Sequence, residues 1–192
     1  MKTHALPLLL TAALLAGCAA SPPVRLYQLR ATPAAARADL PAGLVSLGPV
    51  LLPDYLDRST LVQREGAAGL KALDGHRWAE PLADASARVL RENLAARLGD
   101  ARVWTPPLPT GLRATRTLRV ELLRFEADEG GASLLLAARW TWLDPNGKAA
   151  PLVQTRDWRL PIAQSGPDGL AAAHSQALDA LAEALATSLP AP

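Results

Sequence analysis

The most chemically varied stretch of the chain is Pro53-Asp54-Tyr55-Leu56-Asp57-Arg58, which follows a long apolar run. Two carboxylates, a phenol and a guanidinium this close together could serve acid–base chemistry. Such chemistry needs carboxylates that are held apart around a substrate and whose pKa values are shifted in different directions. Asp54 and Asp57 are only three residues apart, beside Arg58. This spacing is typical of a turn in which the acids bind backbone groups and pair with the arginine, so we predict no catalytic residue here.

Tyr55 and Leu56 have no role in a simple turn, and two interpretations stay open. Their side chains either pack back under the turn or offer a partner an anchor. Trp78 has the same ambiguity, because a tryptophan shortly before a helix that begins at Pro81 can also act as a hydrophobic staple. The candidate partner contacts are Tyr55, Leu56, Asp57, Arg58 and Trp78.

Motifs for other chemistries are missing from the sequence. It contains no Gly-x-Ser-x-Gly motif, no phosphate-binding loop and no dinucleotide fingerprint. His76 and His174 are far apart and have no cysteine or carboxylate at ligand spacing, so we predict no metal site and no cofactor. His174 falls on an apolar helix stripe and is interpreted as a core residue. The sequence therefore predicts a protein that is not an enzyme.

Cys18 is the exception, because its surroundings predict a covalent modification. The apolar run Ala5–Ala16 is too short to span a bilayer but suits a signal peptide, and it leads into the letters LAGC. This ending resembles the bacterial lipobox, in which the cysteine thiol is acylated before cleavage on its N-terminal side. Residues 1–17 are thus predicted to be a lipoprotein signal peptide that is removed. The alternative is an ordinary secretory signal that is cut after Ala19 or Ala20.

Acylation of Cys18 with fatty acids such as palmitate has physical consequences. One acyl chain binds a membrane only marginally, whereas two or more hold stably. Residues 18–23 would form a short lipidated tether, and no disulfide is possible because the chain has no second cysteine. Ala19 in place of an aspartate favours sorting to the outer membrane. We therefore expect the protein to be lipid-anchored on the periplasmic face of the outer membrane.

The length of the chain beyond the tether predicts one domain, and its charge does not favour binding to nucleic acid. Residues 24–192 have the length of a single domain with a sizeable core. The formal net charge of +2 falls to +1 when Lys2 is removed, so no basic field favours nucleic acid.

Hydrophobic periodicity predicts the elements of this domain. Apolar residues at three- and four-residue steps indicate helices over about 81–98 and 168–189, with Asp168 as a possible N-cap. Strands are predicted at 24–30, 44–52, 61–64, 118–126, 134–142 and 152–160. The alternation slips at Leu122-Leu123, which predicts a bulge or a strand covered on both faces. We expect an α/β fold with a mixed sheet of six to seven strands, an antiparallel meander at the end, and two main helices packed on the sheet.

Several segments together resemble a known family. They are the lipobox, Tyr27-Gln28-Leu29, the stretch GPVLLPDYLDRSTLVQR from Gly48, and His76-Arg77-Trp78-Ala79-Glu80-Pro81-Leu82. In this combination they resemble the ABC-type transport auxiliary lipoproteins, a family that includes the outer-membrane lipoprotein of the paraquat-inducible transport system. Related sequences often have Pro-Gln-Ile where this chain has Ser59-Thr60-Leu61.

The resemblance implies a fold and a role. The fold implied is a three-layer α/β sandwich of the anticodon-binding or TolB N-terminal kind. The role implied is a non-enzymatic docking component of an envelope lipid transport system, whose partner is a mammalian-cell-entry (MCE) domain protein in an assembly tethered to the inner membrane. A homo-oligomeric ring is also implied.

Two other functions stay open. The chain could be an assembly factor or plug of another outer-membrane complex, in which case it would co-purify with a β-barrel protein. It could also be a periplasmic hydrolase, for which the missing nucleophile motif offers no support.

Overall fold

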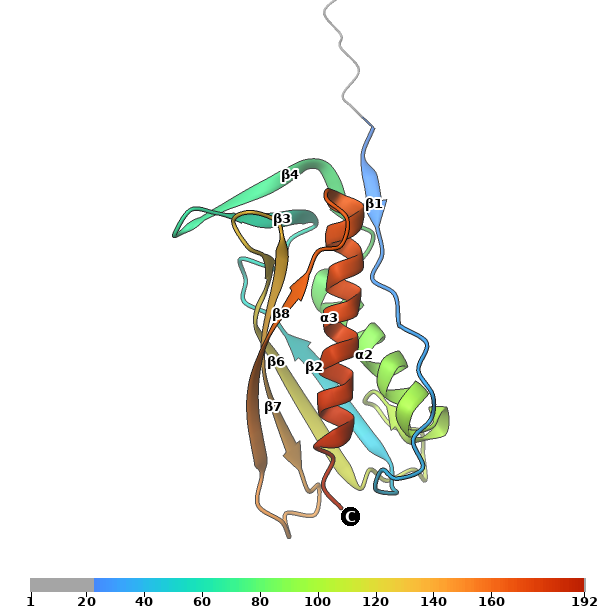
Figure 1. Cartoon of the computed structure of the whole chain (residues 1–192). Coiled ribbons are helices and arrows are strands. Elements are labelled where there is room, and N and C mark those ends of the chain that lie inside the picture. Colours follow the sequence, from blue (N-terminus) through green and yellow to red (C-terminus); the bar gives the residue numbers. More distant parts are fainter. Residues whose placement is uncertain (1–22, 192) are drawn as a thin grey trace, which may run out of the picture.

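A computed structural model describes residues 23–191, which contain eight strands and two long helices (Figure 1). Cys18, the predicted signal peptide 1–17 and most of the predicted tether 18–23 lie outside the described residues. The strands are β1 (Arg25–Tyr27), β2 (Val45–Leu51), β3 (Thr60–Glu65), β4 (Gly69–Trp78), β5 (Val103–Trp104), β6 (Arg116–Ala127), β7 (Ser133–Leu143) and β8 (Leu152–Pro161). The helices are α2 (Leu82–Leu98), the short 3-10 helix η1 (Asp100–Arg102) and α3 (Pro167–Thr187).

The strands form one mixed sheet, as the sequence predicts. The order is β1-β4-β3-β6-β2-β5, and β7 and β8 extend the sheet from β6. Strands β6, β7 and β8 form the predicted antiparallel meander. Strand β2 runs parallel to both β5 and β6, and β1 runs parallel to β4. The count exceeds the predicted six to seven because neither β4 nor the two-residue β5 has a periodic apolar pattern that would predict a strand.

Irregularities in strand pairing occur where the sequence pattern changes. The register of β2 against β6 shifts between Leu47 and Val50, at the Gly48-Pro49 pair. The register of β6 against β7 shifts between Leu122 and Arg124. The second shift confirms a bulge at the predicted slip, and it changes which side chains of β6 face the helices.

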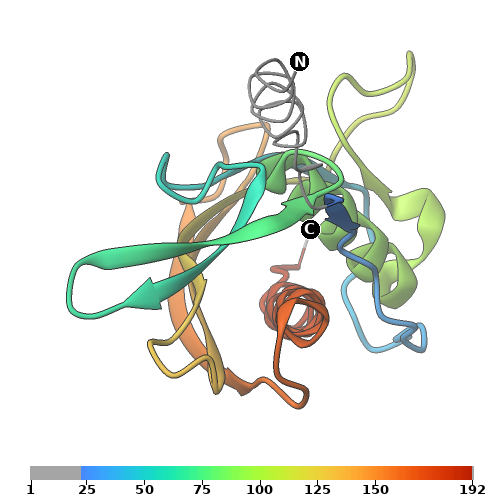
Figure 2. The same cartoon turned by 90° about the horizontal axis from the view of Figure 1, so that it is seen from above.

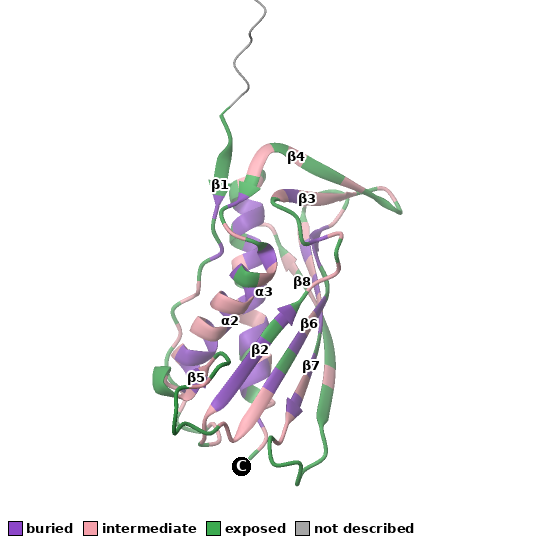
Figure 3. Ribbon diagram, turned by 180° about the vertical axis from the view of Figure 1, so that it is seen from behind, coloured by how far each residue is buried: buried purple, intermediate pink, exposed green. Residues whose placement is uncertain are grey.

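Helices α2 and α3 pack against each other and cover the same face of the sheet (Figure 2). Helix α2 contacts β2 and β5, whereas α3 contacts β6, β7 and β8. The domain therefore has two layers, which corrects the three-layer sandwich that the resemblance implies. The opposite sheet face has exposed Arg119 and Arg139, and such charged side chains favour water over a second helical layer (Figure 3).

The helix ends differ slightly from the prediction. Helix α2 follows Pro81 and ends before Gly99, whose φ of 106° suits a residue without a Cβ. Helix α3 begins at Pro167, so Gly166 and not Asp168 is its N-cap. It runs from the end of the domain where β1 lies to the opposite end, where the C-terminus lies (Figure 1).

Candidate docking surface

The Pro53–Arg58 motif forms a tight turn directly after β2. The backbone N–H groups of Leu56 and Asp57 both donate to the Pro53 carbonyl oxygen, at 2.9 Å and 3.3 Å. Arg58 Nε donates to the Tyr55 carbonyl oxygen at 3.2 Å, and Arg58 makes no salt bridge with a described residue. The strand-exit turn is therefore confirmed, whereas the expected pairing of the acids with Arg58 is wrong. Asp54, Asp57 and Arg58 are exposed.

Tyr55 is fixed by a buried carboxylate on β6. Its hydroxyl donates to Glu126 Oε2 at 2.9 Å, and Arg64 Nε donates to Glu126 Oε1 at 3.0 Å. The Glu126 side chain is completely buried. We call Tyr55, Arg64 and Glu126 the Glu126 clamp, because they hold the turn, β3 and β6 together.

The electrostatics of the Glu126 clamp keep its donors protonated. Burial, and then the hydrogen bond to Glu126, raise the pKa of Tyr55 to about 12. The hydrogen bond to Glu126 likewise raises the pKa of Arg64. A general base must reach a proton on its substrate, and Glu126 has no exposed surface through which a substrate could approach. The arrangement can position a loop, but it offers no route to a substrate.

Two of the predicted partner contacts are in the core. The Leu56 side chain is only 1% exposed and packs within the main hydrophobic cluster. Trp78 is also buried, with its ring centroid 5.1 Å from that of His174. Neither side chain is available on the surface of this structure, which corrects their interpretation as partner contacts. Tyr55 is half-buried.

His174 lies on α3 with its ring enclosed by aromatic side chains. Its Nδ1 donates to the Leu170 carbonyl oxygen at 2.8 Å, and Phe125 lies edge-on with the ring centroids 4.5 Å apart. Burial lowers the pKa of His174 to about 4. The ring is thus neutral at physiological pH, as expected for the core residue that the sequence predicts.

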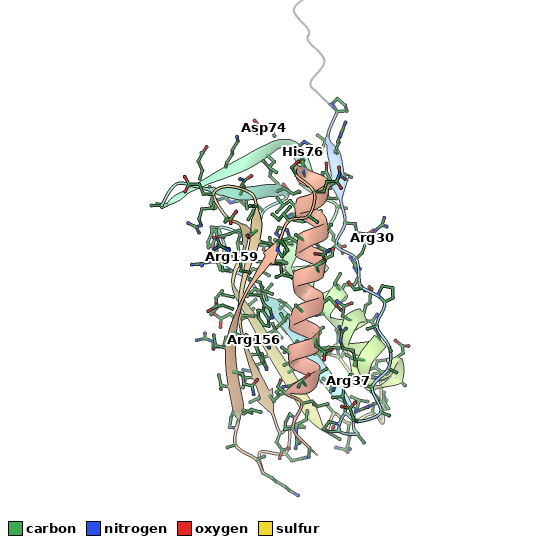
Figure 4. The ribbon with its side chains drawn as sticks, in the orientation of Figure 1. Arg30, Arg37, Asp74, His76, Arg156 and Arg159 are labelled. Carbon is green, nitrogen blue, oxygen red and sulfur yellow. The ribbon has the colours of Figure 1, made fainter. Side chains whose placement is uncertain are left out.

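The tryptophans of the meander face the helices. Trp140 and Trp142 are buried, and both indole N–H groups donate to Ser188 Oγ at 3.1 Å. Trp158 is half-buried, stacks on Trp140 with centroids 6.4 Å apart, and has the Arg156 guanidinium 5.3 Å from its ring centroid. Figure 4 shows Arg156 on β8 beside α3. Trp140 and Trp142 are therefore core residues, and Trp158 packs at the edge of the core.

The sheet face opposite the helices was not identified from the sequence. We call it the open face and define it by Leu51, Arg119, Glu121, Leu123, Arg124 and Arg139. Leu51 is 58% exposed, although it ends an otherwise buried strand. The bulge in β6 makes Leu123 and Arg124 consecutive exposed residues, so the slip in alternation was the signal that could have found them.

The open face combines apolar area with unpaired positive charge. Arg139 pairs with Glu121, whereas Arg119 and Arg124 form no salt bridge with any residue between 23 and 191. A cavity of about 570 Å³ on this face is lined in part by Leu51, Arg119 and Thr141. The Pro53–Arg58 turn adjoins this face, because it follows Leu51 and is held by Glu126 on β6.

In the described part of the chain, no three His, Cys, Asp or Glu side chains are grouped closely enough to hold a metal ion. Residues 23–191 also contain no helix that is long and apolar enough to cross a membrane.

Residues 23–191 thus form a mixed α/β fold whose sheet face opposite the helices carries exposed leucines and arginines. The family profile described as ABC-type transport auxiliary lipoprotein component matches residues 27–186. The chain therefore belongs to the family of ABC-type transport auxiliary lipoproteins. No curated protein is significantly similar to it in sequence.

Solved structures share this fold at low sequence identity. The crystal structure of an uncharacterized protein is similar with a TM-score of 0.71 and 18% identity, over 88% of this chain and 100% of that one. Protein XCC0632 from Xanthomonas campestris, assigned to the family DUF330, is similar with a TM-score of 0.69 and 16% identity, over 85% and 93% of the two chains. Because the identities are only 18% and 16%, these similarities show a shared fold and nothing about function.

Proposed function

We propose that this protein is a non-enzymatic docking component of an envelope lipid transport system, anchored to the outer membrane through acylated Cys18. Its partner is an MCE-domain protein of an assembly tethered to the inner membrane. Membership of the auxiliary lipoprotein family supports a role beside an ABC-type transporter. The lipobox-like letters around Cys18 support the anchor.

The open face is the observation that carries the docking role. This sheet face carries Leu51 and Leu123 among arginines that have no acid partner within residues 23–191. Such a face suits a partner surface that is apolar at its centre and acidic around it. The Glu126 clamp stiffens the adjoining turn, so Asp57 and Arg58 are presented without a large loss of loop entropy on binding. A homo-oligomeric ring of such chains would present several open faces to one partner.

The anchor is tested by Cys18→Ala. Labelled palmitate should be incorporated into the wild-type protein and not into the variant, and the variant should leave the outer-membrane fraction because no acyl chains hold it. Cys18→Ala protein that remains membrane-bound and is processed normally would contradict the anchor. Ala19→Ser is the matched control, because it changes the adjacent residue and leaves the thiol.

The partner is tested by chemical crosslinking in intact envelopes, followed by purification of the wild-type protein. Recovery of an MCE-domain protein is the expected result. Recovery of a β-barrel protein without an MCE-domain protein would contradict this function and favour a plug or assembly factor.

A further inference from the structure

One corner of the sheet combines strongly exposed apolar side chains with an arginine. On β1, Leu26 is 67% exposed and Val24, just before the strand, is 50% exposed. Because side chains alternate along a strand, both lie on the outer face of β1, whereas Tyr27 is buried. Arg77 on β4 is the register partner of Leu26 and is also exposed. We call Val24, Leu26 and Arg77 the β1 corner.

The charge at the β1 corner is available for an external ligand. Arg77 and the neighbouring Arg25 form no salt bridge with any residue in the described range. The acid nearest in sequence on β4 is Asp74, which is exposed (Figure 4) and makes no ion pair with Arg77. The two residues are separated by Gly75, whose φ of 74° interrupts the regular strand. The outer face of the corner is therefore apolar and positive.

The position of the β1 corner limits what can cover it. The described chain begins at Pro23, directly before Val24, and Cys18 is five residues earlier. Five fully extended residues span at most about 18 Å. An acyl anchor on Cys18 would thus keep the corner within reach of the headgroup layer of its membrane.

Apolar side chains beside an arginine are suited to contact with a membrane surface. Apolar side chains gain free energy at the boundary between headgroups and acyl chains. A guanidinium binds phosphate oxygens in a bidentate manner, and anionic lipids attract basic residues near the surface. A partner protein would not need to lie beside the anchor, whereas a lipid surface always does.

We propose that the β1 corner is a membrane-contact site, in which Val24 and Leu26 insert among the lipid headgroups and Arg77 binds a lipid phosphate. This inference rests on the proposed acylation of Cys18. It deepens the docking function, because a domain held at two points cannot swing freely on its tether. Helix α3, with 21 residues and a length of about 31 Å, then separates the membrane end from the opposite end of the domain (Figure 1).

The test uses the full acylated protein with a single added thiol. Cys18 is the sole cysteine and its sulfur is blocked by the lipid, so Leu26→Cys can be labelled uniquely with an environment-sensitive fluorophore. The protein is reconstituted into vesicles of phosphatidylethanolamine and phosphatidylglycerol that contain nitroxide-labelled lipid. The matched control is Leu112→Cys, an exposed leucine in the loop before β6, and Val24→Cys gives an independent second reading.

The probe at residue 26 should be quenched severalfold more strongly by the nitroxide lipid than the probe at residue 112. Adding Arg77→Glu should reduce that quenching. Equal quenching at both positions in protein whose mass shows the acyl chains would overturn the membrane contact and leave the anchor intact. Shielding of residue 26 from aqueous iodide without quenching by lipid would also overturn it, because a protein would then cover the corner. A mass without acyl chains would instead overturn the anchor, and the inference with it.

Discussion

At the scale of single residues, the Glu126 clamp explains why the Pro53–Arg58 turn has one conformation. A buried carboxylate is costly unless charged or polar donors satisfy it, and Tyr55 and Arg64 supply those donors. The sequence shows that a turn is present, but it gives no sign that Tyr55 reaches a residue 71 positions away. That contact depends on the pairing of β3 and β6, which local patterns do not encode.

Tyr55→Phe tests the Glu126 clamp. Removing a hydrogen bond to a buried charge should lower the free energy of unfolding by about 2 kcal/mol. Tyr27→Phe is the matched control, because the Tyr27 hydroxyl is hydrogen-bonded to His76 Nδ1 at 2.8 Å without a carboxylate, and its loss should be about 1 kcal/mol. Urea denaturation at pH 7 measures both. A smaller loss for Tyr55→Phe than for Tyr27→Phe would contradict the importance of the clamp.

His174 makes stability depend on pH. Its pKa is about 4 in the folded protein, against an ordinary value of 6.5, so the unfolded chain binds more protons between these values. The folded state therefore has its full stability with respect to His174 above pH 6.5, where the ring is neutral in both states, and loses stability as the pH falls toward 4. It should amount to about 2 kcal/mol between pH 7.5 and pH 5.

Denaturation of the wild type and of His174→Gln at pH 7.5 and pH 5 measures this dependence. The variant should be less stable at pH 7.5 and should lose less stability on acidification. Asp128 and Glu183, whose pKa values are lowered, lose their stabilisation only below pH 4–5, so they do not obscure the comparison. An unchanged pH dependence in the variant would show that other groups are responsible.

At the scale of elements, the periodic parts of the sequence predicted the structure well. Both long helices and the three meander strands are found close to their predicted ranges, because each buries one regular apolar face. Strand β4 was missed because only Trp78 at its end is buried, and the rest lies in a hairpin that projects from the domain (Figure 2), where no buried face imposes an alternation. Its pairing with β3 is a tertiary property.

Arg97 is a charged residue on the buried face of α2. It lies seven residues after Leu90 and four after Asn93, so helical spacing places it on the same face as these buried side chains. It is only 6% exposed and lies between the two helices. It donates to Asp179 Oδ1 and Glu183 Oε2 on α3, both at 2.8 Å. These two acids, which compensate the buried charge, are more than 80 residues away in sequence, so the pairing could not be predicted from the sequence of α2 alone.

Arg97→Ala should therefore destabilise the packing of α2 against α3. The variant leaves two acids on α3 without their partner and removes the buried stem of the arginine, so we expect a loss of about 3 kcal/mol in the free energy of unfolding. Arg91→Ala is the matched control on the same helix, because Arg91 only approaches Asp100 at 3.9 Å on the surface. Its loss should be below about 0.5 kcal/mol. Equal losses would contradict a special role for Arg97.

At the scale of the whole molecule, the helices on one sheet face leave the other face free for a partner. The predicted contacts Asp57 and Arg58 lie beside that face, whereas Leu56 and Trp78 serve the core. If the β1 corner rests on the membrane, the tether and the corner together fix the direction in which the open face points. A docking protein benefits from such a fixed orientation, because less rotational freedom is lost on binding.

Site-specific photocrosslinking in intact envelopes tests the docking role most directly. A photoreactive residue at Leu123, on the open face, should capture an MCE-domain protein. The same residue at Gln176, an exposed position on α3, should not. Capture of the MCE-domain protein from Gln176 and not from Leu123, or from neither position while the wild type is anchored and folded, would contradict docking through the open face.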